Sequence, residues 1–253
     1  MQVINRVVLT VGVLLLASSA IASSQKSDDK RLNESTTVLS EIRNASDNGI
    51  PEATWSKADC VVVIPSLKKA GFIIGGEFGS GVMSCRKGNG WSAPVFMDLT
   101  KGSAGFQIGA QSTDLVLLVM NRRGVEKLLG NKVTLGADAS VAAGPTGRTA
   151  AAATDVQMSA EMLSYSRTRG LFAGIDLSGG TLKPDSDANA RAYGSNVSAH
   201  DIALGTTPVT MSAEARAFTN SLGRNVRATT GVKKSTGVKK STGVKKSTGV
   251  KKY

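Results

Sequence analysis

The chain has 253 residues, of which 28 are glycine, and it carries a formal net charge of +12. Residues 221–253 contribute +10 of this charge and Arg6 contributes +1, so residues 23–220 carry only +1. The length allows one large domain or two small ones. The charge distribution excludes a strongly basic folded domain, because the positive charge that gives the chain its high isoelectric point lies at the C-terminal end.

The first 22 residues have the pattern of a secretory signal peptide. Arg6 precedes an almost wholly apolar run over residues 7–16, and Ala20 and Ala22 place small side chains where a signal peptidase reads. The apolar stretch is shorter than the roughly 20 residues of a membrane span, and an uncleaved anchor is the alternative. We therefore expect an exported protein, periplasmic or secreted, that associates with the cell envelope.

Residues 29–47 show helical periodicity, since one face carries the apolar residues Leu32, Val38, Leu39 and Ile42. Asn48 and Gly49 predict the end of this helix, and Pro51 suits the first turn of a short second helix through Lys57. At Cys60 the pattern changes to a β-branched strand closed by Pro65.

Most of the following chain has the pattern of strands and turns. Residues 87–90 predict a hairpin turn, and residues 122–129 predict a short helix that Gly130 ends. Further helices are expected at 185–193 and 210–222. The strand-like stretches are 71–77, 81–86, 92–99, 102–110, 114–120, 132–142, 154–167 and 171–177.

Many of the glycines fall in the strand region, where they favour bends, bulges and close backbone approach. A strongly curved sheet uses glycine in this way. The expected fold class is therefore α+β, with a curved, glycine-rich antiparallel sheet or small barrel and flanking helices.

Cys60 and Cys85 are the two cysteines of the chain. In an exported protein they can pair, and closing such a loop stabilises the fold by roughly 3 kcal/mol in the chain-entropy description. Two buried thiols are the alternative, because the sequence does not tell whether the two Cβ atoms face each other.

The sequence offers little for catalysis. The single histidine, His200, indicates no Ser-His-Asp or Cys-His arrangement and no zinc site. Residues 76–81 imitate a phosphate-binding glycine loop, but a strand-like stretch follows where that motif requires a helix. Asp185 begins a sequence like a calcium loop that lacks the required glycine and glutamate, and we expect it to cap a helix instead. We expect no catalytic residues, no metal and no cofactor.

Several motifs in order resemble the SYLF domain family and cover about residues 28–195. They are Ile64-Pro-Ser-Leu-Lys-Lys-Ala-Gly-Phe72, Gly75-Gly-Glu-Phe-Gly-Ser-Gly81, Trp91-Ser-Ala-Pro94 and the stretches 102–112, 135–140, 143–148 and 165–174. The resemblance implies a non-catalytic lipid-binding domain; eukaryotic members bind phosphoinositides and are linked to cortical actin, and bacterial members are typically exported. Because this chain has a signal peptide and no SH3 or FYVE domain, we do not expect actin as a partner.

A lipid site needs cations for the phosphate and an apolar surface. The best headgroup candidates are cations in or beside turns, and Leu171 and Phe172 are candidates for insertion into a bilayer, with core packing as their alternative. The headgroup candidates are Lys68, Lys69, Lys101, Arg148, Arg167 and Arg169. The expected partner is an anionic phospholipid or membrane surface.

Residues 230–253 contain the tetrapeptide GVKK four times and cannot bury enough apolar surface to fold. We expect a disordered tail there, a signal peptide at 1–22, a SYLF-like domain at 28–195 and a helical extension at 196–229. The tail can bind any polyanion, without specific recognition of nucleic acid. The alternative function is therefore a structural or stress-related envelope protein that its lysine-rich tail anchors to polyanions.

Overall fold

The structure is a computed structural model that describes residues 24–42, 49–71, 74–104, 112–130, 132–146, 159–168 and 171–227. The expected signal peptide at 1–22 and the lysine-rich tail at 230–253 lie outside the described residues. No helix of the described part is long and apolar enough to cross a membrane.

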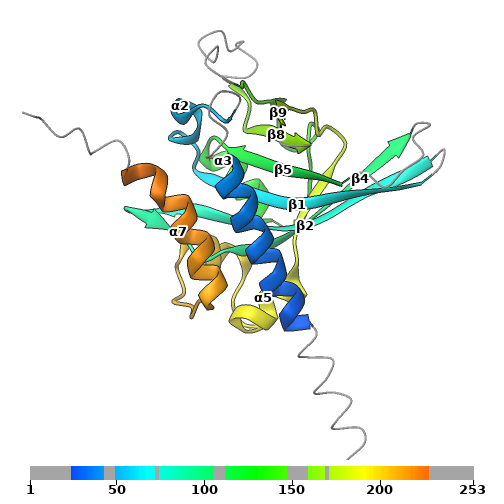
Figure 1. Cartoon of the computed structure of the whole chain (residues 1–253). Coiled ribbons are helices and arrows are strands. Elements are labelled where there is room, and N and C mark those ends of the chain that lie inside the picture. The colour runs from blue at the N-terminus through cyan, green and yellow to red at the C-terminus, as the bar shows by residue number, and fades with distance from the viewer. Residues whose placement is uncertain are drawn as a thin grey trace, which may run out of the picture.

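A ten-stranded sheet forms the centre of the molecule, and helices flank it (Figure 1). The helices are residues 24–42, α2 (Glu52–Trp55), α3 (Arg122–Leu129), α5 (Ser186–Tyr193), α6 (Ala199–Leu204) and α7 (Ala213–Arg227). The strands are β1 (Cys60–Gly71), β2 (Ile74–Lys87), β3 (Gly90–Trp91), β4 (Val95–Ala104), β5 (Ser112–Val119), β6 (Val133–Thr134), β7 (Val141–Ala143), β8 (Met162–Thr168), β9 (Leu171–Gly174) and β10 (Thr181–Pro184).

The sheet has the strand order β6-β10-β4-β2-β1-β5-β8-β7, with β3 paired to β2 and β9 paired to β8. All of these pairs are antiparallel except β7 and β8, which run parallel. The sheet curls into a half-barrel, so the predicted α+β class with a curved sheet and flanking helices is confirmed. Because of the β7–β8 pair the sheet is mixed rather than purely antiparallel.

The two faces of the sheet carry separate cores. Val61 and Val63 point to one face, where they pack with the helix at 24–42 and with Phe218 of α7. The alternate residues of β1, Cys60, Val62 and Ile64, point to the other face, against α3 and α6. This alternation is the period of a strand buried on both sides. In Figure 1 the helix at 24–42 (dark blue) and α7 (orange) lie side by side across one face.

The helix predictions are largely confirmed. The four apolar residues predicted to share a face of the first helix are all buried, and α3 has the predicted bounds. Asp185 caps α5 by accepting a hydrogen bond from the Ala188 amide at 3.0 Å. The prediction missed α6 and β10, which are only six and four residues long.

Pro65 does not close the first strand, which is a correction to the sequence analysis. The strand β1 continues to Gly71 through a bulge, where the pairing with both β2 and β5 shifts register. At the bulge Ser66 has a φ of 57°, and its amide donates a 3.0 Å hydrogen bond to Asp114 Oδ1 of β5. A bulge gives proline a place inside a sheet, because the local ladder is already interrupted.

Opposite the bulge, β2 runs as one strand where two were expected. At Gly81 a Cβ atom would lie 2.0 Å from the carbonyl oxygen of Val63 and 2.8 Å from Ile64 Cα. The two backbones therefore approach each other more closely than any side chain permits. The residues 76–81 that imitate a phosphate loop lie within this strand, and the chain continues as a strand after Gly81, where the phosphate-binding motif requires a helix.

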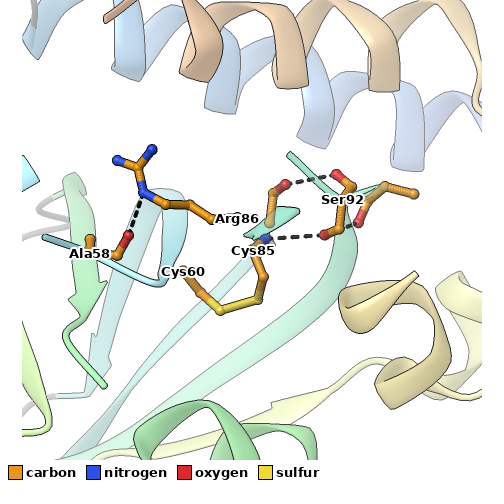
Figure 2. Close-up of a disulfide and its surroundings, with 7 residues drawn as sticks. Ala58, Cys60, Cys85, Arg86 and Ser92 are labelled. Atoms are coloured by element: carbon orange, nitrogen blue, oxygen red, sulfur yellow. Dashed lines mark hydrogen bonds between the residues drawn. A yellow bond between two sulfur atoms is a disulfide. The ribbon is translucent and has the colours of Figure 1, made fainter. Parts of the chain in front are cut away.

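The two cysteines form a disulfide that joins β1 to β2 (Figure 2). Cys60 and Cys85 are direct partners in the register, with Cα atoms 3.9 Å apart. The Arg86 amide donates to the Asp59 carbonyl at 2.7 Å, which makes the cysteines a non-hydrogen-bonded pair, the closer of the two antiparallel arrangements. Of the two alternatives left open by the sequence, the disulfide is the one found.

Replacing Gly81 by alanine should destabilise the fold by at least about 2 kcal/mol, because the new methyl group overlaps backbone atoms that cannot rotate away. Urea unfolding measures the change. Gly102→Ala is the matched control, since a Cβ there meets nothing within 4 Å. Equal stability of the two variants would contradict the close approach of β1 and β2.

Candidate functional site

Four of the six predicted headgroup cations lie within the described residues, and these four do not form one cluster. Arg148 and Arg169 lie outside the described residues. Lys69 pairs with Glu77 at 3.7 Å, and the Lys101 ammonium donates to the Asp176 carbonyl at 3.1 Å. These two lysines therefore have partners within the protein, and only Lys68 and Arg167 remain to be placed.

Arg167 belongs to a structural network. Its guanidinium bonds to Asp114 Oδ2 at 3.1 Å and to Glu41 of the N-terminal helix, and it lies 5.9 Å from the centre of the Phe172 ring. Phe172 itself is 7% exposed and packs in the core beneath that helix. Its position corresponds to the core-packing alternative rather than to membrane insertion, and the side chain of Leu171 lies outside the described part.

Lys68 lines a groove between the N-terminal helix and the bulge of β1, with a volume of about 340 Å³. We call it the helix–bulge groove. It is lined by Ser27, Lys30, Arg31, Glu34, Pro65, Ser66, Lys68, Phe78, Gly79 and Ser80. Among these residues only Lys68 was predicted, because no local sequence signal joins residue 30 to residues 66–80.

The cations of the groove differ in how firmly they are held. Arg31 is mostly buried, bonds to Asp185 at 3.0 Å and lies 5.4 Å from the centre of the Phe96 ring. Lys30 is well exposed and makes only a loose 3.7 Å pair with Glu34, a type worth about 0.5 kcal/mol. Lys68 is exposed, and no ion pair of it occurs within the described residues.

Phe78 gives the groove its apolar part. It is 57% exposed, and among the described residues it is the one large hydrophobic side chain that lies largely in the solvent. It faces Lys68 directly across the β1–β2 ladder, so both side chains project from the same face. Its ring lies over Gly76, where a Cβ atom would come within 2.7 Å of it. An exposed ring beside two available ammonium groups suits a ligand that is both anionic and apolar.

A second hollow, of about 720 Å³, lies at the start of α3, and we call it the α3 hollow. Its floor is Glu161, 6% exposed, whose two carboxylate oxygens each lie 2.9 Å from Lys127 Nζ. The Ser140 amide also donates to Glu161 at 2.9 Å. The lining residues are Asn121, Arg122, Arg123, Lys127, Gly136, Ala137, Asp138, Ser140, Ser159 and Glu161.

The described residues contain no group of three or more His, Cys, Asp or Glu side chains that could hold a metal. His200 lies on α6, outside both hollows described above. The absence of catalysis stays a prediction.

Comparison with known proteins gives a consistent result. Residues 100–225 match the family described as "Ysc84: Las17-binding protein actin regulator". The chain is 36% identical over 198 residues to the Homo sapiens "SH3 domain-containing YSC84-like protein 1", covering 78% of this chain and 57% of that protein. It is 36% identical over 163 residues to "LAS seventeen-binding protein 3" of Saccharomyces cerevisiae, covering 63% of this chain and 35% of that protein. The chain thus spans just over half the length of the Homo sapiens protein and about a third of the Saccharomyces cerevisiae protein.

These comparisons correct one expectation. The expected signal peptide, and the expectation of no SH3 or FYVE domain, argued against actin as a partner. That inference is wrong, because the matching family is described as an actin regulator and one relative is named for binding Las17. The folded part that this chain shares with them gives no ground for excluding actin.

Replacing Glu161 by glutamine should lower stability at neutral pH by about 2 kcal/mol, because Lys127 then loses its partner. Burial alone would raise the pKa of Glu161, but the bonds from Lys127 and Ser140 and the charge of Arg123 hold it below its ordinary value. The carboxylate therefore stabilises the fold fully above its ordinary pKa of about 4.3. This stabilisation is lost as the pH falls through the lower, folded value.

Urea unfolding across this acidic range measures the effect, and the difference between wild type and Glu161→Gln should narrow as the pH falls. Glu126→Gln is the control, since Glu126 makes an exposed pair with Arg122 at 3.0 Å, and it should change stability by less than about 0.5 kcal/mol. A stability difference between wild type and Glu161→Gln that stays constant with pH would contradict the lowered pKa of Glu161.

Proposed function

The chain belongs to the Ysc84 (SYLF) family, and from this premise we propose that its folded body is a non-catalytic module that binds anionic phospholipid at a membrane surface. The observation that carries the proposal is the helix–bulge groove, where the exposed Phe78 ring stands beside the exposed Lys68 and Lys30 side chains.

The groove supplies the two interactions that a phospholipid surface requires. Ammonium groups near an anionic leaflet contribute on the order of 1 kcal/mol each. An aromatic side chain at the interface adds burial of its apolar surface. Since residues 23–220 carry a net charge of only +1, the attraction must come from this local arrangement rather than from the charge of the whole body.

We propose in addition that the protein is exported and acts at the cell envelope, in the periplasm or outside the cell. The signal-like sequence of residues 1–22 supports this. The Cys60–Cys85 disulfide also supports it, because such bonds persist in oxidising compartments.

The test is vesicle co-sedimentation of a protein that ends at Arg227, compared with a triple variant Lys30→Gln, Lys68→Gln and Phe78→Ser. The protein ends at Arg227 because α7 runs to that residue. Leu222 of α7 is buried, so a chain that ended within this helix would leave the core open. With vesicles that contain phosphatidylglycerol, the triple variant should bind at least about thirtyfold more weakly, as two lost lysines imply.

The matched control is the double variant Lys57→Gln and Lys132→Gln, two exposed lysines away from the groove, which should bind nearly as wild type does. If only the chain with its lysine-rich tail binds, and salt abolishes that binding, the groove is not the lipid site. The alternative of an envelope protein anchored to polyanions by its tail would then hold.

A second candidate function is binding to actin or its regulators, and the description of the matching family favours it. Co-sedimentation of the same Arg227-terminated protein with filamentous actin tests this candidate. Saturable pelleting that the groove variant does not change would place the actin site elsewhere on the body. No pelleting at any salt concentration would leave actin binding to the parts of the relatives that this chain does not cover.

A further inference from the structure

The α3 hollow is separate from the helix–bulge groove. Its helix contributes Val125 and Leu128 to one core, while the N-terminal helix that borders the groove packs in the core on the opposite face of the sheet. Cys60 pairs with Val119 beside the hollow, and the groove begins five residues along β1 at Pro65. At about 3.3 Å per residue the two sites are roughly 16 Å apart.

The acidic groups of the α3 hollow are already satisfied. Lys127 and the Ser140 amide occupy both oxygens of Glu161 at 2.9 Å. Asp138 turns one oxygen to the Thr134 amide at 2.7 Å. The charge of Glu161 is thus balanced by Lys127, and the arginines of the hollow face the solvent.

Arg122 and Arg123 are the available cations. Their side chains are 79% and 80% exposed. Arg122 makes only an exposed pair with Glu126 at 3.0 Å, and Arg123 approaches Glu161 no closer than 4.0 Å. Pairs of this kind are weak and exchange readily for a better partner. A guanidinium group bonds an oxyanion through two parallel N–H donors, which makes phosphate its preferred ligand.

We propose that the α3 hollow is a second binding site, which takes the phosphate group of a ligand between Arg122 and Arg123. The volume of about 720 Å³ leaves room for the remainder of such a ligand. Because α3 packs on the opposite face of the sheet from the helix that borders the groove, a molecule held on a membrane through the groove presents the side that carries α3 to the solution. A soluble phosphate compound is then its source, and a lipid headgroup is the other source with the same chemistry.

Isothermal titration of the full chain with inorganic pyrophosphate at low ionic strength tests this site. The double variant Arg122→Gln and Arg123→Gln should bind at least about tenfold more weakly than wild type, since two charge-assisted contacts are lost. The control is Lys26→Gln with Lys57→Gln, two exposed lysines that line neither the groove nor the hollow. It removes the same charge and leaves the tail unchanged, so any general attraction of the anion falls equally in both variants.

Loss of pyrophosphate binding in the arginine variant alone supports the proposal, and equal affinities, or an equal loss in both double variants, overturn it. A second arm uses vesicles that contain phosphatidic acid. If the arginine variant no longer binds these vesicles but still binds pyrophosphate as wild type does, the phosphate comes from a lipid headgroup. Thermal unfolding of both variants should match wild type, because all four side chains are exposed at the surface.

Discussion

The close contact of β1 with β2 at Gly81 is the constraint on which the rest of the structure depends. With the Val63 carbonyl oxygen 2.0 Å from the place of a Cβ atom, only glycine allows the two strands to approach so closely there. Directly beyond this contact β1 bulges at Ser66, and Asp114 of β5 holds the bulge through the Ser66 amide. The close contact and the bulge beside it therefore shape the wall that β1 and β2 give to the helix–bulge groove.

The N-terminal helix forms the other wall, and apolar burial is the main reason that it stays in place. Its four buried side chains each contribute roughly 1.5–3 kcal/mol, more than its ion pairs can. The ion pairs instead fix the rotation of the helix about its own axis. They join Asp28 to Arg191 at 2.9 Å, Arg31 to Asp185 at 3.0 Å, and Glu41 to Arg167. That rotation brings Lys30 to the same groove as Phe78.

The elements that the sequence predicted well are those with a local cause. The helix at 122–129 has a capping Asn121 and a terminal Gly130, and the hairpin at 87–90 has a Gly88 with φ of 55°. Pro65 misled the prediction because proline usually ends a strand, and only contact with a neighbouring strand makes a bulge the better solution. The Cys60–Cys85 bond likewise depends on register, which a single sequence does not supply.

The candidate site depends even more strongly on long-range contacts that a single sequence does not supply. Six cations had equal standing in the sequence, since each lies in or near a turn. The structure describes four of them and separates these four by what faces them: Glu77, Asp114 and the Asp176 carbonyl occupy three, and Lys68 stands opposite an exposed ring. An ionic partner inside the fold removes a side chain from the set that can bind a ligand, because breaking that pair costs about as much as the new contact contributes. Long-range pairing, rather than the number of cations, therefore determines where an anion can bind on a body whose net charge is close to zero.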